Sequence, residues 1–191
     1  TNILGWAVMI AFGMNAAISV RVSNELGATH PRTAKFSLVV AVATSFLIGV
    51  VLSLFLIATR NEYPSLFSND TDVRALVKNL TPLLATCIVI NNVQPVLSGV
   101  AIGAGWQAPV AYVNIACYYA VGVPLGLIMG YKLNMGVRGI WYGMLFGTVL
   151  QTCVLFLMVY RTNWNKEASV AEDRIRKWGG HIDSKEDDAE K

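Results

Sequence analysis

Long runs of apolar residues, separated by short polar segments, fill the chain from its first residue to about Tyr160. The third run carries no Asp, Glu, Lys or Arg over the 53 residues from Asn79 to Tyr131. A hydrocarbon core ~30 Å thick needs about 20 residues for one helical crossing. This run is therefore long enough for two crossings, joined by the Gly- and Pro-containing turn at 103–109. The whole pattern predicts five membrane-spanning helices, at residues 1–20, 35–59, 79–104, 108–131 and 138–161.

The length of these runs also indicates the fold class. A segment that crosses lipid must satisfy its own backbone hydrogen bonds, which leaves helices or a closed barrel. Barrel strands alternate in polarity over ~10 residues, whereas these runs are continuously apolar. The composition agrees, because 54% of residues are hydrophobic and 14% are charged, with a mean hydropathy of +0.50. Soluble domains carry about 25% charged residues. We therefore expect an all-α integral membrane protein that spans the lipid bilayer several times.

The polar residues after the last run form a tail at 162–191, which the sequence predicts to be solvated. With five crossings, ten Lys and Arg residues lie on the side of the tail and five on the other side. Lys and Arg collect on the cytoplasmic side of membrane proteins, so the tail is expected to be cytoplasmic. The net charge of +3 is small and dispersed, and it does not indicate a nucleic-acid partner.

Polar side chains interrupt the third predicted helix in a regular pattern. Asn91, Gln94 and Ser98 follow Cys87 at helical spacing and form one stripe. Pro95 lies within it, and its missing N–H removes the partner of the Asn91 carbonyl. Such a bendable, hydratable point is tolerated where backbone faces protein or a water-filled cavity. The stripe either lines a solute path or bonds neighbouring helices, at ~0.6–2 kcal/mol for each hydrogen bond.

The fourth predicted helix has the same combination of polar side chains and a proline. Asn114 and Tyr118 lie on one face, and the missing N–H of Pro124 removes the hydrogen-bond partner of the Ala120 carbonyl. The glycines at 122, 126 and 130 are typical of a helix-packing ridge. In the fifth helix, Gln151 either faces a cavity or bonds a neighbouring helix. The candidate residues for a solute path are Asn91, Asn92, Gln94, Asn114, Tyr118 and Gln151, with Pro95 and Pro124 as bend points.

No acidic or basic residue lies inside a predicted span, away from its end residues, although proton relays in membranes normally use one. The three cysteines at 87, 117 and 153 lie in apolar runs without metal-ligand spacing. The sequence also has no phosphate-binding loop and no catalytic triad pattern. We therefore expect a protein that is not an enzyme, with no catalytic residue, no metal and no bound cofactor.

Several separate motifs are similar to one known family. They are Arg21-Val-Ser-Asn-Glu-Leu-Gly-Ala28, the segment 95–107, Val113-Asn-Ile-Ala-Cys-Tyr-Tyr119 and Gly139-Ile-Trp-Tyr-Gly-Met144. In these motifs the chain resembles plant multidrug and toxic compound extrusion (MATE) transporters of the DETOXIFICATION family. The resemblance implies a twelve-helix fold of two six-helix lobes. This chain would supply helices eight to twelve, most of the C-terminal lobe, and the N-terminal lobe of the same polypeptide would be its partner.

The resemblance also implies an activity, which is antiport of organic small-molecule solutes, flavonoid- or alkaloid-like, against protons or another cation. The gradient would be the driving force, at the vacuolar or plasma membrane. Plant members often carry an Asp in the tenth helix, and that position aligns here with Asn91, which cannot titrate. Their glutamate in the seventh helix lies outside this chain. A passive anion channel and a non-transporting membrane scaffold are the alternatives.

Overall fold

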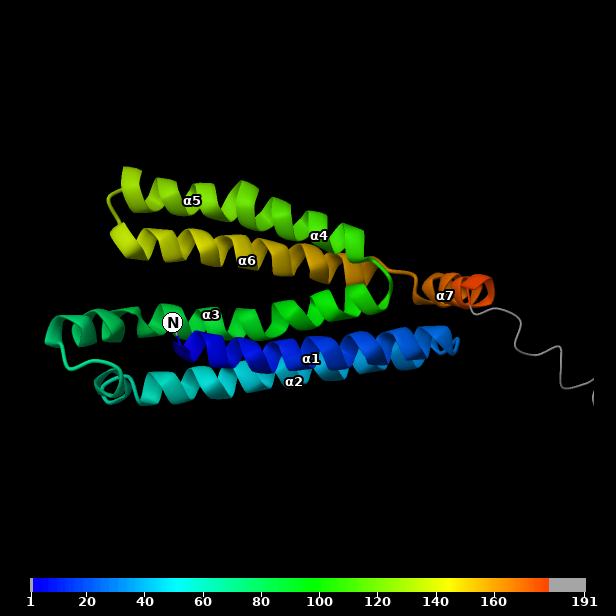
Figure 1. The fold of residues 1–191 in the computed structure, drawn as a ribbon, viewed down its shortest axis with the longest axis horizontal. Coiled ribbons are helices and arrows are strands. Elements are labelled where there is room, and N and C mark those ends of the chain that lie inside the picture. The colour runs from blue at the N-terminus through cyan, green and yellow to red at the C-terminus, as the bar shows by residue number, and fades with distance from the viewer. Residues whose placement is uncertain (1, 179–191) are drawn as a thin grey trace, which may run out of the picture.

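The computed structural model describes residues 2–178, and its regular elements are all helical (Figure 1). They are α1 (Asn2–Gly27), α2 (Pro31–Ala58), the 3₁₀ helix η1 (Tyr63–Leu66), α3 (Thr71–Gly103), α4 (Gln107–Ile115), the π-helix η2 (Ala116–Gly122), α5 (Val123–Leu127), the π-helix η3 (Ile128–Lys132), α6 (Gly136–Arg161) and α7 (Trp164–Trp178). The elements α4 to η3 follow one another as a single rod. Within the described residues, five rods are long and apolar enough to cross a membrane: α1, α2, α3, α4–η3 and α6.

The rods begin and end some residues away from the spans that the apolar runs predict. The largest difference is in α3, which begins at Thr71 and not near residue 79. Asp70 caps this helix, because its Oδ1 accepts hydrogen bonds from the backbone nitrogens of Asp72 at 2.8 Å and Val73 at 3.4 Å. The first turns of α3 carry Arg74 and Lys78, so a criterion based on missing charges starts the helix too late.

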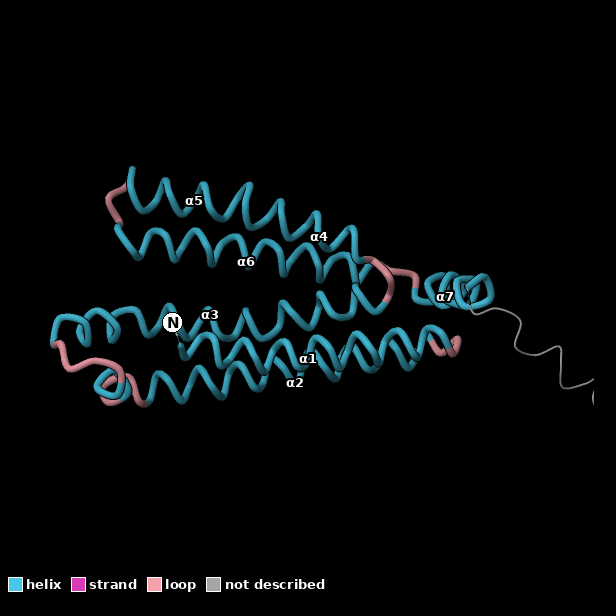
Figure 2. The backbone as a smooth tube through the Cα atoms, viewed as in Figure 1, coloured by secondary structure: helices cyan, strands magenta, loops and turns pink. Residues whose placement is uncertain are grey.

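The helices α1, α2 and α3 pack together as one group, and α6 joins this group to the α4–η3 rod (Figure 1). The loops at the two ends of the bundle are short (Figure 2). Glycine allows α1 and α3 to approach closely, since a Cβ on Gly99 would lie 2.5 Å from the Asn15 carbonyl oxygen. A Cβ on Gly103 would lie 2.6 Å from the Ser19 carbonyl oxygen. These contacts place Asn15 beside the C-terminal third of α3.

A second close contact joins α6 to the α4–η3 rod through two facing rows of glycines. Gly122, Gly126 and Gly130 form one row, and the residues at 139, 143 and 147 form the other. A Cβ on Gly143 would collide with the Gly126 backbone, and one on Gly147 would lie 2.9 Å from the Gly122 Cα. The ridge in the fourth predicted helix is therefore a packing surface, as close small-residue contacts between membrane helices are.

The helix α7 lies at the end of the bundle that holds the α1–α2 loop and the α3–α4 turn (Figure 1). Trp164 and Ala168 on α7 are buried in one apolar cluster with Val22 and Leu26 of α1. The first half of the predicted solvated tail is therefore a docked helix. Residues 179–191, the rest of that tail, lie outside the described residues.

Candidate functional site

A cavity of about 420 Å³ lies among four of the five rods. Its lining includes seven polar side chains and no acidic or basic one. Its lining residues are Phe12 and Asn15 of α1; Gln94, Pro95, Ser98 and Ile102 of α3; Val110, Asn114, Ile115, Tyr118 and Tyr119 of the α4–η3 rod; and Gln151 of α6. Polar groups that converge in a largely preformed concavity are typical of a small-molecule site.

Amide side chains bond across this cavity between helices. Gln151 donates from Nε2 to Asn114 Oδ1, which joins α6 to α4. Asn15 donates from Nδ2 to the Pro95 carbonyl, which joins α1 to α3. Along α3, Gln94 Nε2 donates to Ser98 Oγ at 3.1 Å. These bonds join the walls of the cavity in two pairs, α6 with α4 and α1 with α3.

Each linked amide keeps one polar atom for another partner. Asn114 Nδ2 and Gln151 Oε1 make no hydrogen bond within residues 2–178. One is a donor and the other an acceptor, so a hydroxyl or carbonyl group of a solute can bond to either. Neither atom is among the fully buried atoms that lack a partner, so both are accessible from the cavity. A solute that bonds to these atoms would take the place of water there.

The two tyrosines of the cavity lie in the π-helix η2, with ring centroids 5.9 Å apart at an interplanar angle of 67°. In a π-helix each N–H reaches the carbonyl five residues back, as the Val123 nitrogen does to the Tyr118 oxygen. Pro124 is exposed outside the cavity, whereas Pro95, the other predicted bend point, is buried in its wall.

Two of the predicted residues lie elsewhere. Asn91 is half-buried, and its Nδ2 donates to the Cys87 carbonyl at 2.9 Å. Asn92 is 1% exposed and faces α2, where a Cβ on Gly49 would lie 3.3 Å from the Asn92 Cβ. Its Nδ2 donates to the Ile88 carbonyl at 2.8 Å, and its Oδ1 has no partner among the described residues. Neither side chain lines the cavity.

The other four predicted residues, Gln94, Asn114, Tyr118 and Gln151, meet at one cavity. Sequence reasoning did not include Asn15 and Phe12, which close the cavity from α1. The signal for Asn15 was an amide in the middle of an apolar run. Phe12 gave no signal, because one aromatic residue in such a run is ordinary.

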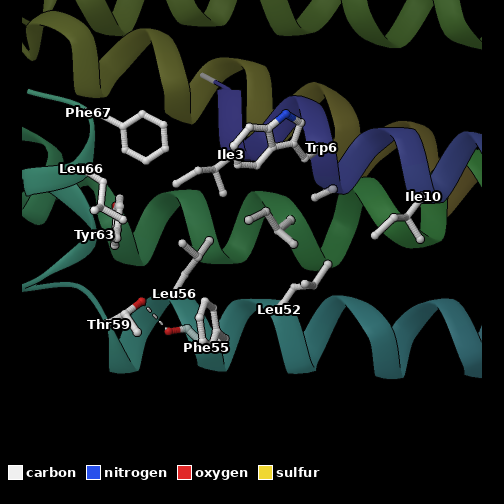
Figure 3. A pocket seen from close by; sticks show the side chains of 12 residues that line it. Ile3, Trp6, Ile10, Leu52, Phe55, Leu56, Thr59, Tyr63, Leu66 and Phe67 are labelled. Atoms are coloured by element: carbon white, nitrogen blue, oxygen red, sulfur yellow. Dashed lines mark hydrogen bonds between the residues drawn. The ribbon is translucent and has the colours of Figure 1, made fainter.

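A second cavity, of about 290 Å³, lies between α1, α2, η1 and Ile88 of α3 (Figure 3). It lies at the end of the bundle away from α7 (Figure 1). Its walls are apolar, and its two hydroxyl groups are already bonded within the protein. Thr59 Oγ1 donates to the Phe55 carbonyl at 2.8 Å, and Tyr63 Oη shares a 2.6 Å hydrogen bond with Thr81 Oγ1. Beside these bonded hydroxyls, the Trp6 indole is the remaining polar side chain of this cavity. The cavity is therefore much poorer in hydrogen-bonding groups than the first, which favours the first cavity as the functional site.

The part of the chain that the structure describes has no group of three His, Cys, Asp or Glu side chains placed to hold a metal ion. The chemistry of the first cavity is thus the hydrogen bonding of amides and phenols beside aromatic rings.

Known proteins resemble this chain over most of its length. The MatE family model matches residues 1–128. Protein DETOXIFICATION 29 of Arabidopsis thaliana is 70% identical over 181 residues, which are 95% of this chain and 36% of that protein. Protein DETOXIFICATION 32 of the same plant is 65% identical over 186 residues, 97% of this chain and 36% of that protein. The chain therefore spans about a third of the length of these curated relatives.

The crystal structure of the eukaryotic MATE transporter AtDTX14 matches the fold with a TM-score of 0.86 at 34% sequence identity. The match covers 91% of this chain and 39% of that one.

Proposed function

The chain belongs to the MatE family and is a multi-pass, all-α part of the C-terminal lobe of a MATE transporter, and from this premise we propose that its amide-lined cavity is part of a solute path. The observation that carries the proposal is the convergence of amides from α1, α3, α4 and α6 on one uncharged cavity. Packing alone would not require the donor of Asn114 and the acceptor of Gln151 to remain unpaired there.

The lining indicates the class of solute. Phe12, Tyr118 and Tyr119 provide aromatic surface, and the amides provide both donors and acceptors. A planar organic molecule with several hydroxyl or carbonyl groups fits this combination, as a flavonoid- or alkaloid-like compound does. A solute that carries a fixed charge would find no opposite charge among the lining residues of this chain.

The proposed activity is secondary active antiport, with a gradient of protons or another cation as the driving force. The cavity lining contains no Asp, Glu, His, Lys or Arg, and Asn91 is a neutral amide bonded to its own helix. The coupling group is therefore proposed to lie elsewhere in the complete polypeptide. The N-terminal lobe would close the cavity from the other side, in a vacuolar or plasma membrane with α7 on the cytoplasmic side.

A passive anion channel is the alternative, and one observation favours it: the cavity presents amide and phenol donors but no carboxylate. Such a lining stabilises an anion by hydrogen bonds without binding it tightly. A non-transporting scaffold, in which the amides only join helices, is the remaining alternative.

One experiment separates these functions. The full-length protein is reconstituted into vesicles, a pH gradient is imposed with the membrane potential clamped, and uptake of a fluorescent flavonoid is measured. Antiport predicts uptake that follows the gradient and falls at least about tenfold in Gln94→Leu. An anion current measured in the absence of the flavonoid would support the channel. Flavonoid uptake that does not depend on the pH gradient would contradict proton coupling. Equal activity of Gln94→Leu and of the wild type would remove this cavity from the path.

A further inference from the structure

An apolar groove of about 880 Å³ runs between α2 and α6, on the surface of the bundle. This volume lies within the ~300–1,000 Å³ range of small-molecule sites. Its lining residues are Lys35, Leu38, Val39, Val42, Ala43 and Phe46 of α2; Val93 and Leu97 of α3; Thr152, Cys153, Phe156, Leu157, Val159 and Tyr160 of α6; and Trp164 of α7. Lys35, at the end nearest α7, is the one charged residue among them.

The groove is separate from the amide-lined cavity. Val93 and Leu97 line the groove, whereas Gln94 and Ser98 on the adjacent face of α3 line the cavity. In α6 the same division falls between Gln151 and Thr152. A ligand in the groove would therefore not obstruct the proposed solute path.

A polar pocket of about 310 Å³ adjoins the groove at its α7 end. It is lined by Pro31, Arg32, Lys35, Thr162, Asn163, Trp164 and Asn165. Lys35 and Trp164 line both spaces, so the apolar groove continues into the polar pocket. The lining contains two cations, two amides and a hydroxyl group, and no carboxylate.

The charges of this pocket are uncompensated within the described residues. Arg32 and Lys35 are exposed, and neither forms a salt bridge with residues 2–178. The pocket also lies at the N-terminus of α2, which begins at Pro31 and receives no side-chain cap from His30. The N–H groups at such a helix end favour an anion. Two cations and a helix N-terminus together form a site for a phosphate group.

We propose that an anionic phospholipid binds here, with an acyl chain in the α2–α6 groove and its phosphate in the pocket of Arg32 and Lys35. Basic pockets between membrane helices bind anionic headgroups in this way. The buried Trp164 lies where the two spaces meet, a position typical of an aromatic ring at the membrane interface. A packed protein helix would fill the groove but would leave both cations uncompensated, and free phosphate would not use the groove. The proposal rests on membrane insertion and not on the transported solute.

Native mass spectrometry of the full-length protein tests this site, with phosphatidylglycerol and phosphatidylcholine offered as competing lipids. The double variant Arg32→Gln/Lys35→Gln should lose the preference for phosphatidylglycerol by about thirtyfold, since each of the two basic residues near a membrane surface contributes ~1 kcal/mol and about 1.4 kcal/mol corresponds to a tenfold change. Exchanging the cations in Arg32→Lys/Lys35→Arg should retain it. The matched control is Arg60→Gln/Arg138→Gln, which removes two exposed cations at the other end of the bundle and should change nothing.

A second arm tests the groove with the charges intact. Ala43→Trp places a large ring in the groove, and we expect it to reduce lipid retention without changing the affinity for inorganic phosphate. An unchanged lipid preference in Arg32→Gln/Lys35→Gln would overturn the proposal. It would equally be overturned if millimolar inorganic phosphate displaced the lipid completely while Ala43→Trp had no effect, because the pocket would then bind phosphate alone.

Discussion

Trp106 donates a hydrogen bond from Nε1 to Glu167 Oε2 at 3.2 Å, across 61 positions of sequence. The bond joins the turn between α3 and α4 to α7. Gly105, beside Trp106, has a φ of +87°, and a Cβ there would collide with the Arg174 guanidinium of α7. The turn itself closes α3, since the Trp106 nitrogen donates to the Ala101 carbonyl at 2.9 Å. The helix α7 is thus attached to the point where the chain reverses between two membrane rods.

Removing this hydrogen bond should loosen α7. A charge-assisted bond contributes about 1.5–3 kcal/mol when it is buried, and less at this partly buried site. We expect Glu167→Ala to raise amide hydrogen exchange in α7 of the full-length protein several-fold. Glu172→Ala on the exposed face of the same helix is the matched control. Equal exchange in the two variants would show that the Trp106 contact does not hold α7.

The facing glycine rows predict a sharp size limit between α6 and the α4–η3 rod. Gly143→Ala adds a Cβ that meets the Gly126 backbone, and overpacking of this kind costs about 1–3 kcal/mol. We expect a lower thermal unfolding midpoint for the full-length protein in detergent. Gly13→Ala is the control, because nothing lies within 4 Å of a Cβ at that position. A similar midpoint for both variants would contradict the close contact.

The end of α1 stores backbone strain at Thr29, a β-branched residue with a φ of 58°. The left-handed conformation costs a residue other than glycine about 1–2 kcal/mol. Thr29→Gly should therefore stabilise the full-length protein by roughly 1 kcal/mol, measured as a higher unfolding midpoint. Asn134, with a φ of 54°, offers a comparison at the α6 end. Asparagine tolerates this region better, so Asn134→Gly should raise the midpoint by less.

Hydropathy predicted the five membrane rods because a hydrocarbon crossing needs a long apolar run whatever it packs against. It did not predict α7, whose charged residues resemble those of a solvated tail. Within the described residues, Trp164 and Ala168 of α7 are buried against the bundle. The apolar residues of α7 do recur at helical spacing, at 164, 168, 171 and 175, but the many charges between them led to the interpretation as a solvated tail. The π-helix η2 was also not predicted, because Pro124 indicated a kink and not a change of helical spacing.

The sequence predicted only part of the candidate site, because the neighbour that each helix face meets also decides which side chains reach the cavity. Helical spacing placed Asn91, Gln94 and Ser98 on one stripe, but a membrane rod is surrounded by several neighbours. The cavity lies against Gln94 and Ser98, while Asn91 bonds along its own helix. Asn92 faces α2, whose Gly49 leaves room for it. Which neighbour each face meets depends on tertiary packing, and the residues of α3 alone do not specify it.

The hydrogen bond between Gln151 and Asn114 gives the most direct test of the cavity. Each single variant, Asn114→Leu or Gln151→Leu, leaves the other amide without its partner, which costs about 1–3 kcal/mol. The double variant removes both polar groups. We therefore expect it to be less destabilised than the sum of the single variants, with a coupling energy of about 1 kcal/mol in thermal unfolding of the full-length protein.

Transport should respond differently from stability in these variants. If the amides bind solute, the double variant recovers stability but not flavonoid uptake, which stays at least about tenfold below the wild type. Asn92→Leu is the control, because it replaces a more deeply buried amide of α3 that lies outside the cavity. Its uptake should match the wild type. Recovery of uptake in the double variant would mean that the two amides serve only to join α4 to α6.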